Sequence, residues 1–215
     1  MIILNVVADI EYGLLEPTEV EAMVGVLAEA FSRYEPLAVA VGLSAPEIAQ
    51  IVSAFSPKAL AETLTVVARE ASSKDLVGAL LVEDFGTPPP EGLDQIVPAF
   101  APIGAFLDGL DQQYRASRTI SVGTHLHLLM IGVAHRVAGR GIAHQLITTC
   151  LANGKTRGYS LAVTEATGSV SQHVFRALGF RDILSAPYKD FVFNEEAVFV
   201  PIVEPEAAIL MERAI

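Results

Sequence analysis

The sequence predicts one α/β (α+β) domain, residues 1–215, in which helices cover both faces of a mixed β-sheet. Three observations support this fold class. Segments of strand and helix character alternate along the chain, a glycine-containing turn near residue 140 joins a strand to a helix, and 52% of the residues are hydrophobic. A chain of 215 residues with this composition can bury one substantial core, so no second domain is needed.

The first half of the chain supplies three strands and two helices. Isoleucine and valine dominate the first strand, and acidic residues after Pro17 start a helix that ends before Pro36, because the residue before a proline disfavours the α conformation. Ser44 is a typical N-cap for the helix that follows. The expected ranges are a strand over 2–8, helices over 17–33 and 45–55, and paired strands over 64–69 and 76–82.

The second half begins with proline and glycine over 85–90, which break regular structure. Helical spacing returns over 93–114, where Pro98 and Pro102 should kink or split the helix. This apolar segment has two open roles, as the cover of a substrate pocket or as a homodimer surface. Strands are expected over 125–133, 159–164, 180–184, 197–203 and 207–213, and helices over 141–157 and 169–178.

Charge and hydropathy exclude several classes of partner. The formal net charge is −11 and the isoelectric point about 4.8, which argues against nucleic acid, because binding a phosphate backbone needs a positive surface. The same charge weakly favours cationic small molecules. Apolar runs stay far below the roughly 18 to 20 residues that cross a bilayer, and no charged leader opens the chain, so we expect a cytoplasmic protein without a membrane partner.

The most informative segment is the turn between the strand at 125–133 and the next helix. A strand that enters a turn of small residues and then a helix presents free backbone N–H groups and the positive end of the helix dipole, which suits a phosphate. Tight packing would produce the same pattern. Two registers fit, one beginning at Ala138 and one at Arg136, and we prefer the first because Ile142 then begins the buried stripe of the helix.

About forty residues after this turn, Leu178-Gly179-Phe180 closes a second helix. The turn and this helix end, at this spacing, resemble the GNAT superfamily of N-acetyltransferases. The resemblance implies a sheet of about seven strands, acetyl-CoA as co-substrate, a pantetheine arm along the strand end and a diphosphate in the turn. The cofactor-binding residues expected from it are Ile131, Gly132, Val133, Ala138, Gly139, Arg140, Gly141, Ile142, Ala143 and Phe175.

Three segments, 31–37, 167–180 and 187–191, are further similar to the insect dopamine and arylalkylamine N-acetyltransferases. In that family a glutamate after the first helix acts as general base, and the matching position is Glu35. The amine arrives protonated and must lose a proton before it attacks, so a carboxylate suits this position. A residue that merely ends a helix before Pro36 would look the same.

The family's two helper hydroxyls map onto Thr167 and Ser171. Helix capping would also explain Thr167 or Ser169, whereas Ser171 lies inside the expected helix and is harder to explain in that way. Many superfamily members carry a tyrosine near the end of this helix that protonates the departing thiolate. Phe175 stands there instead and cannot donate a proton, so the acid stays unassigned.

His125 and His127 form a His-x-His on the strand that enters the site, and His127 is a candidate for acid–base work. Strand alternation places His127 on the same face as Leu129, Ile131 and Val133. The alternative is a packed or surface histidine. Glu165, after the next strand, is a candidate for orienting a cationic amine, and no metal site is expected because no third ligand stands at a useful spacing.

These patterns predict an N-acyltransferase that moves an acyl group from acetyl-CoA to the amine of a small molecule, such as an arylalkylamine, by direct transfer in a ternary complex. Two alternatives stay open. Ala138 and Phe175 depart from the superfamily pattern, which would suit a non-catalytic acyl-CoA-binding protein. An enzyme of another GNAT branch would act on a polyamine, an aminoglycoside or a protein amine.

Overall fold

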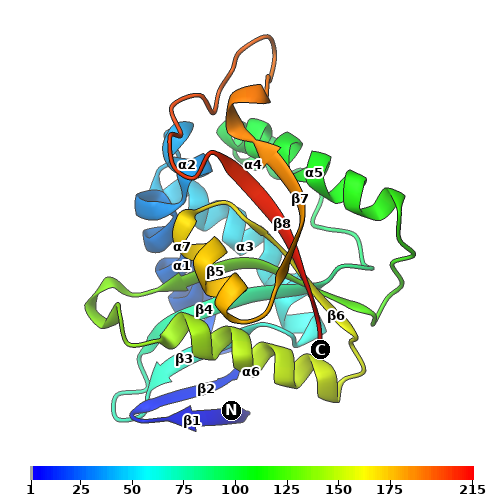
Figure 1. The fold of residues 1–215 in the computed structure, drawn as a ribbon. Helices are drawn as coiled ribbons and strands as arrows, with labels where there is room; N and C mark the ends of the chain where they lie inside the picture. The colour runs from blue at the N-terminus through cyan, green and yellow to red at the C-terminus, as the bar shows by residue number, and fades with distance from the viewer. Residues whose placement is uncertain (1) are drawn as a thin grey trace.

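A computed structural model describes residues 2–215 and contains one eight-stranded sheet in the order β1-β2-β3-β4-β5-β6-β8-β7 (Figure 1). All neighbouring strands are antiparallel except β5 and β6. The α/β class is therefore confirmed, with eight strands in place of about seven. The strands are β1 (Ile3–Val7), β2 (Ile10–Leu14), β3 (Val66–Glu70), β4 (Leu76–Asp84), β5 (His125–Val133), β6 (Leu161–Ala166), β7 (Arg181–Pro187) and β8 (Ala207–Ala214).

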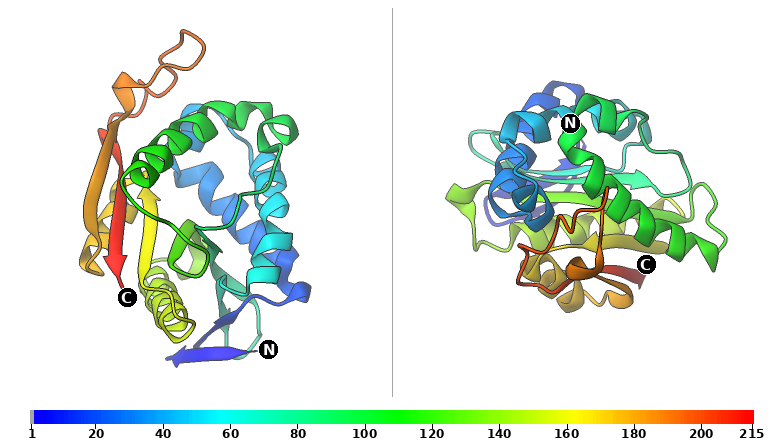
Figure 2. Two further views of the ribbon diagram at one scale, coloured as in Figure 1. Left: turned by 90° about the vertical axis from the view of Figure 1, so that its right-hand side faces the viewer. Right: turned by 90° about the horizontal axis from the view of Figure 1, so that it is seen from above.

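Helices cover both faces of the sheet (Figures 1 and 2). One core contains apolar side chains of α1, α3 and α5, and a second core on the other face contains those of α6 and α7. The helices are α1 (Val20–Tyr34), α2 (Pro36–Ala40), α3 (Ala45–Glu62), α4 (Leu93–Ile96), α5 (Ala101–Ala116), α6 (Ile142–Thr156) and α7 (Ser169–Ala177), with 3-10 turns at Pro17–Glu19, Pro98–Phe100, His135–Val137 and Tyr188–Asp190.

The sheet opens between its two parallel strands. β5 and β6 are paired only from His125↔Leu161 to His127↔Val163, after which they diverge. The hydrogen bond that the Thr164 hydroxyl donates to the Leu128 carbonyl, at 2.9 Å, is the last contact before β5 and β6 separate. Beyond that point, the edge of β5 that faces β6 has no strand partner in residues 2–215. An extended ligand can therefore pair with the backbone of β5 there.

A bulge in β5 changes which side chains share a face. Leu81 pairs with Met130 and Val82 with Leu128, so Leu129 lacks a partner residue on β4. As a result Ile131 and Val133 pack on the α6 side, whereas Leu129 packs against the core that contains α1 and α3. The expectation that simple alternation places His127, Ile131 and Val133 on one face is therefore wrong, because a single extra residue reverses the alternation.

Other differences from the expected elements have local causes. β2 was not expected, since Glu11 and Gly13 interrupt its apolar pattern, but β1 and β3 pair with it on both sides. The segment 197–203, expected as a strand, forms turns beside Pro201, which has no N–H for a ladder. α3 continues through Pro57 to Glu62. No helix formed within residues 2–215 is long and apolar enough to cross a membrane.

Candidate active site

One cavity of about 1260 Å³ reaches three sets of polar groups. It begins beside the turn after β5, passes Glu35 at the start of α2, and ends at Glu83, His127 and Glu165 on three neighbouring strands. α5 runs across the top of the molecule and covers this space (Figure 2). Residues of the apolar middle segment, Phe100, Ile103 and Leu107 among them, line this cavity, as a pocket cover would. The volume exceeds the usual range for one small ligand, so a donor and an acceptor can be held together.

The glycine turn has the shape that a phosphate cradle needs. Gly139 and Gly141 have φ values of 78° and 74°, in the left-handed region that other residues avoid, and open space surrounds both. α6 starts at Ile142, and the amide of Gln145 donates to the Gly141 carbonyl at 3.1 Å. The preceding amides therefore lie in the first turn, where helix geometry gives them no acceptor. Ala138 and Ala143 at either side of the turn line the cavity.

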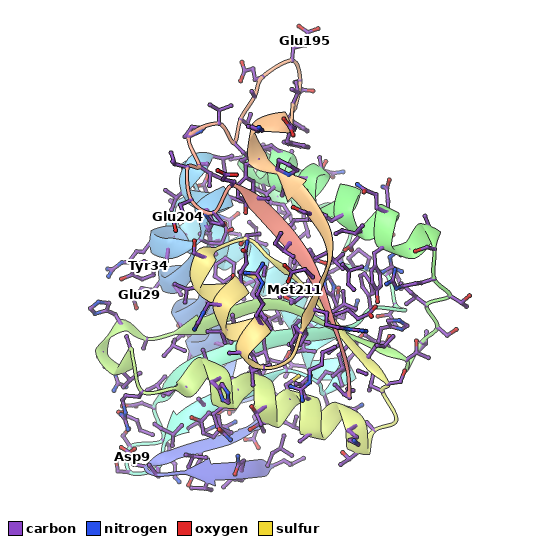
Figure 3. The ribbon with its side chains drawn as sticks, in the orientation of Figure 1. Asp9, Glu29, Tyr34, Glu195, Glu204 and Met211 are labelled. Atoms are coloured by element: carbon purple, nitrogen blue, oxygen red, sulfur yellow. The ribbon has the colours of Figure 1, made fainter. Side chains whose placement is uncertain are left out.

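The arginines of this turn are engaged by acidic side chains. Arg140 pairs with Asp9 at the tip of the β1–β2 hairpin (Figure 3), and Arg136 pairs with Glu70 at 2.8 Å. Both arginines are exposed. The positive charge that either register would offer a diphosphate is thus partly neutralised, so a phosphate at this turn would depend mainly on the backbone amides.

Ile131, Gly132 and Val133 line the cavity at the end of β5. A Cβ atom on Gly132 would lie 3.0 Å from Ala30 Cβ and 3.1 Å from Leu27 Cδ2. The absent side chain therefore makes room for α1. Its open side thus faces a helix, and the bulge of β5 lies at Leu129. The assignment of Gly132 to cofactor binding stays a prediction.

Glu35 occupies the junction of α1 and α2. Its backbone is extended, and its Oε2 accepts a hydrogen bond from the Ala38 amide at 2.5 Å, so it caps α2. Its Oε1 is buried without a hydrogen-bond partner among residues 2–215 and belongs to a residue that lines the cavity. Burial raises the pKa of Glu35 above its ordinary value, although the Ala38 amide and the Thr167 side chain oppose the rise.

Of the two candidate hydroxyls, that of Thr167 lies beside this carboxylate. Thr167 interacts with Glu35, and the Thr167 carbonyl accepts a hydrogen bond from the Tyr188 hydroxyl at 2.5 Å. Ser171 donates to the Gly168 carbonyl at 2.8 Å and accepts from the Gly168 amide at 3.2 Å. Ser171 therefore takes part in capping α7, although its place inside the helix made such a role harder to expect. Both hydroxyl residues line the cavity.

Tyr188 was not expected in the site. It is fully buried, and burial together with the nearby Glu35 carboxylate raises the pKa of its hydroxyl. The similarity of 187–191 to a known tyrosine-containing segment was the signal that pointed to it. Phe175 lies in α7 with its ring 4.9 Å from that of Phe180, and it also lines the cavity.

His127 lies between two carboxylates. Its Nδ1 is 3.1 Å from Glu83 Oε1 and its Nε2 is 2.7 Å from Glu165 Oε2, and all three side chains are less than a tenth exposed. Lys58 of α3 contacts Glu83 at 2.5 Å from the other side. Burial alone would lower the pKa of His127, but the two carboxylates raise it well above its ordinary value, so the ring is a cation at neutral pH.

Asp111 on α5 completes this cluster. Asp111 Oδ1 and Glu165 Oε1 are buried, and no N–H or hydroxyl group in the described part of the chain donates to either. The two carboxyl groups are hydrogen-bonded to each other. Burial and the Glu165 carboxylate raise the pKa of Asp111 to about 8, whereas His127 lowers the pKa of Glu165. Sequence reasoning missed Asp111 and Glu83. Each is an acidic residue in a segment whose apolar residues recur at regular spacing, and this was the signal that could have identified them.

The same cluster is the group of side chains that could hold a metal ion. One ligand atom from each of Asp111, His127 and Glu165 lies within 4.8 Å of the others. However, both ring nitrogens of His127 face carboxylate oxygens, so both act as N–H donors and offer no lone pair. The donor set as it stands fits a metal poorly.

The order of the sheet and the divergence of two parallel strands beside a glycine turn are those of the GNAT fold, and comparisons with known proteins agree. Residues 111–192 match the family model of the acetyltransferase (GNAT) domain. None of the curated protein sequences compared with this chain matches it.

Solved structures extend the likeness over nearly the whole chain. The C-terminal condensation domain of Ebony in complex with β-alanyl-dopamine has a TM-score of 0.89 and 14% identity, with 97% of this chain and 100% of that chain covered. For arylalkylamine N-acetyltransferase 2 from Aedes aegypti the TM-score is 0.72 and the identity 21%, with 96% and 99% covered. A polyamine N-acetyltransferase from Drosophila melanogaster, which forms N-acetylagmatine, has a TM-score of 0.71 and 19% identity, with 96% of this chain and 100% of that chain covered. The chain thus resembles the arylalkylamine branch of the GNAT superfamily in fold.

Proposed function

We propose that the protein is an N-acyltransferase that moves an acyl group from a CoA thioester, acetyl-CoA in the simplest case, to the primary amine of a small molecule. The observation that carries the proposal is the Glu35 carboxylate. It is buried, has an unpartnered oxygen and lines the cavity that also reaches the open edge of β5 and the glycine turn. Residues 1–215 would act as a single domain.

Glu35 would serve as general base. The amine reaches the site as an ammonium ion, and Glu35 takes one proton to free the nitrogen lone pair. A carboxylate whose pKa is raised is a stronger base than an ordinary glutamate, and Thr167 beside it can orient a relay. His127 is less suited to this step, because the carboxylates at both of its nitrogens keep it protonated.

The transfer itself would take place in the opening between β5 and β6. The nitrogen attacks the thioester carbonyl carbon, a C–N bond forms, and backbone amides on the free edge of β5 stabilise the oxyanion. The C–S bond then breaks, and the thiolate leaves with the second proton of the nitrogen. Ser171, which lines the cavity, can donate in this step, whereas Phe175 cannot. The amides at 139–143 would hold the diphosphate.

A direct assay tests the proposal. The protein is mixed with acetyl-CoA and a panel of tyramine, tryptamine, agmatine and spermidine, and thiol release and the mass of each product are measured. We expect stoichiometric amide formation with at least one amine. Acetyl-CoA binding without thiol release on any amine would contradict catalysis and favour the non-catalytic alternative. Transfer to agmatine or spermidine alone would replace the arylalkylamine assignment with a polyamine one.

A second candidate is condensation of an aminoacyl thioester with an amine. One observation favours it: the TM-score with the condensation domain, 0.89, exceeds the values of 0.71 and 0.72 for the two acetyltransferases. The chemistry at Glu35 is unchanged, since only the acyl group differs. The same assay with β-alanyl-CoA as donor separates the two, because the favoured donor gives the larger kcat/KM.

A further inference from the structure

The far end of the cavity holds a set of charges that the transfer at Glu35 does not use. Glu83, Asp111, His127 and Glu165 all line the cavity there, whereas Lys58 reaches Glu83 from behind. Much of the remaining lining is apolar, with Phe85, Leu107 and Leu129 among its members. A buried network built only for stability would be closed to ligands, and this one opens into the substrate space.

The acids of this set are not equally paired with cations. Lys58 pairs with Glu83, and His127 bridges Glu83 and Glu165. Arg115 donates to the Phe85 carbonyl at 2.7 Å and stacks on the Phe85 ring. Among residues 2–215, Asp111 forms no ion pair, and its raised pKa leaves it protonated beside Glu165 near neutral pH. A cation that binds between Asp111 Oδ1 and Glu165 Oε1, to which no N–H or hydroxyl group donates, would take the place of that proton.

We propose that Asp111 and Glu165 form a subsite for a second ammonium group of the substrate, separate from the nitrogen or carbonyl that reacts near Glu35. This inference rests on the proposed function, which places the reacting end of the substrate near Glu35. The ammonium can belong to either partner of the reaction: a diamine acceptor, or a donor whose acyl chain ends in an amine. An NH₃⁺ group brings three donors and one positive charge, which match the oxygens of both carboxyl groups and the one acid of the set that has no ion pair.

An ammonium group fits this place better than a divalent ion. A metal would need a lone pair from His127, but both ring nitrogens donate to carboxylates. The side chain of Glu165 is only 7% exposed, so a hydrated ion would have to lose its water to reach it. An ammonium group at the end of a flexible alkyl chain can cross the apolar cavity more readily.

Equilibrium binding tests the subsite without turnover. Titration calorimetry compares 1,4-diaminobutane with pentylamine, in which a methyl group replaces one ammonium, and β-alanyl-CoA with butyryl-CoA, which differ in the same way. We expect one of the two pairs to show a preference for the ammonium compound on the order of 10- to 100-fold. The pair that shows it identifies the partner that carries the group.

Matched variants locate the preference. Asp111→Asn removes an acid that can ionise when an ammonium binds in the subsite, and Asp75→Asn removes an acid on the exposed β3–β4 turn. We expect Asp111→Asn to reduce the preference by at least about tenfold, and Asp75→Asn to keep it. Glu165→Gln serves as the second subsite variant, with thermal unfolding as a check that it folds.

Three results would overturn the inference: no preference in either pair, an unchanged preference in both subsite variants, or binding of Zn²⁺ with no binding of the amines. Failure of the proposed function is distinguishable from these. If the protein forms no amide yet binds the ammonium compounds selectively, the subsite stands without the catalysis. If amide forms with equal kcat/KM for both members of each pair, the catalysis stands without the subsite.

Discussion

Glu35 and Glu165 are both buried carboxylates that line one cavity, yet their pKa values shift in opposite directions. Glu35 has no ion pair among the described residues. It has only amide and hydroxyl neighbours, so burial dominates and raises its pKa. Glu165 contacts a protonated histidine at 2.7 Å, which lowers its pKa despite similar burial. The difference between the two is the presence of a cation.

This contrast separates two uses of a buried acid. A carboxylate without a cation is a base that can accept a proton from an incoming ammonium, as Glu35 is proposed to do. A carboxylate held by a cation stays ionised and is suited to fixing its neighbours or a charged ligand. The same residue type therefore serves chemistry at one end of the cavity and charge recognition at the other.

Glu35→Gln tests the first use and should have the largest effect. The amide has nearly the same shape but accepts no proton, so we expect kcat/KM for the best amine to fall on the order of 100- to 10,000-fold. The wild-type rate should rise with pH through the raised pKa of Glu35, because only the ionised form accepts a proton, and the variant should lose this limb. Glu29→Gln, on the exposed face of α1 (Figure 3), is the control and should keep full activity. Equal rates in both variants would remove Glu35 from the role of base.

Glu165→Gln tests the second use. It leaves a buried histidine cation with one acid instead of two, so we expect the free energy of unfolding to fall by about 3 kcal/mol. Denaturant unfolding at pH 7 measures the change. Asp182→Asn breaks an ion pair of similar length, Arg176 to Asp182 at 2.7 Å, on the exposed surface, and should change stability by less than about 1 kcal/mol. If the two variants lose the same amount, burial does not distinguish the pairs.

Asp111→Asn extends the comparison to the pH dependence of the free energy of unfolding. With a pKa near 8, the folded protein holds a proton on Asp111 between about pH 4 and 8, where the unfolded chain has released it. Stability contributed by this group is therefore lost as pH rises through that window, by up to about 1.4 kcal/mol per pH unit. Asn does not titrate, so the variant should show a flatter profile of unfolding free energy between pH 4 and 8. Parallel profiles would show that Asp111 is ionised like an exposed aspartate.

Gly141→Ala tests the glycine turn and should have the smallest effect on stability. Open space surrounds this position, so the expected loss of about 1 to 2 kcal/mol comes only from its φ of 74°. Distortion of the turn should also raise KM for the thioester donor more than KM for the amine. Gly25→Ala, inside α1 with equally open surroundings, is the matched control and should stabilise the protein by about 0.5 to 1 kcal/mol. A stabilising Gly141→Ala would contradict a left-handed turn.

Much of the fold follows from local sequence patterns. The strand at 125–133, the helix after the glycine turn and the helix at 169 lie where apolar periodicity places them. Patterns were less informative where pairing decides the outcome: Gly13 and Glu11 obscure β2, and the bulge at Leu129 reverses the face of Ile131 without any mark in the sequence. A bulge depends on the register with β4, which a single strand does not encode.

The sequence by itself determined the mixed α/β class, the glycine turn between a strand and a helix, and the likeness that points to Glu35. These depend on residues close together along the chain, where dihedral preference and periodicity act directly. Only the tertiary structure decided that Asp111 from α5 meets Glu165 from β6 and that Lys58 from α3 holds Glu83. Those contacts join segments more than 20 residues apart along the chain. The roles of these charged side chains depend on their shared burial and on the cavity beside them.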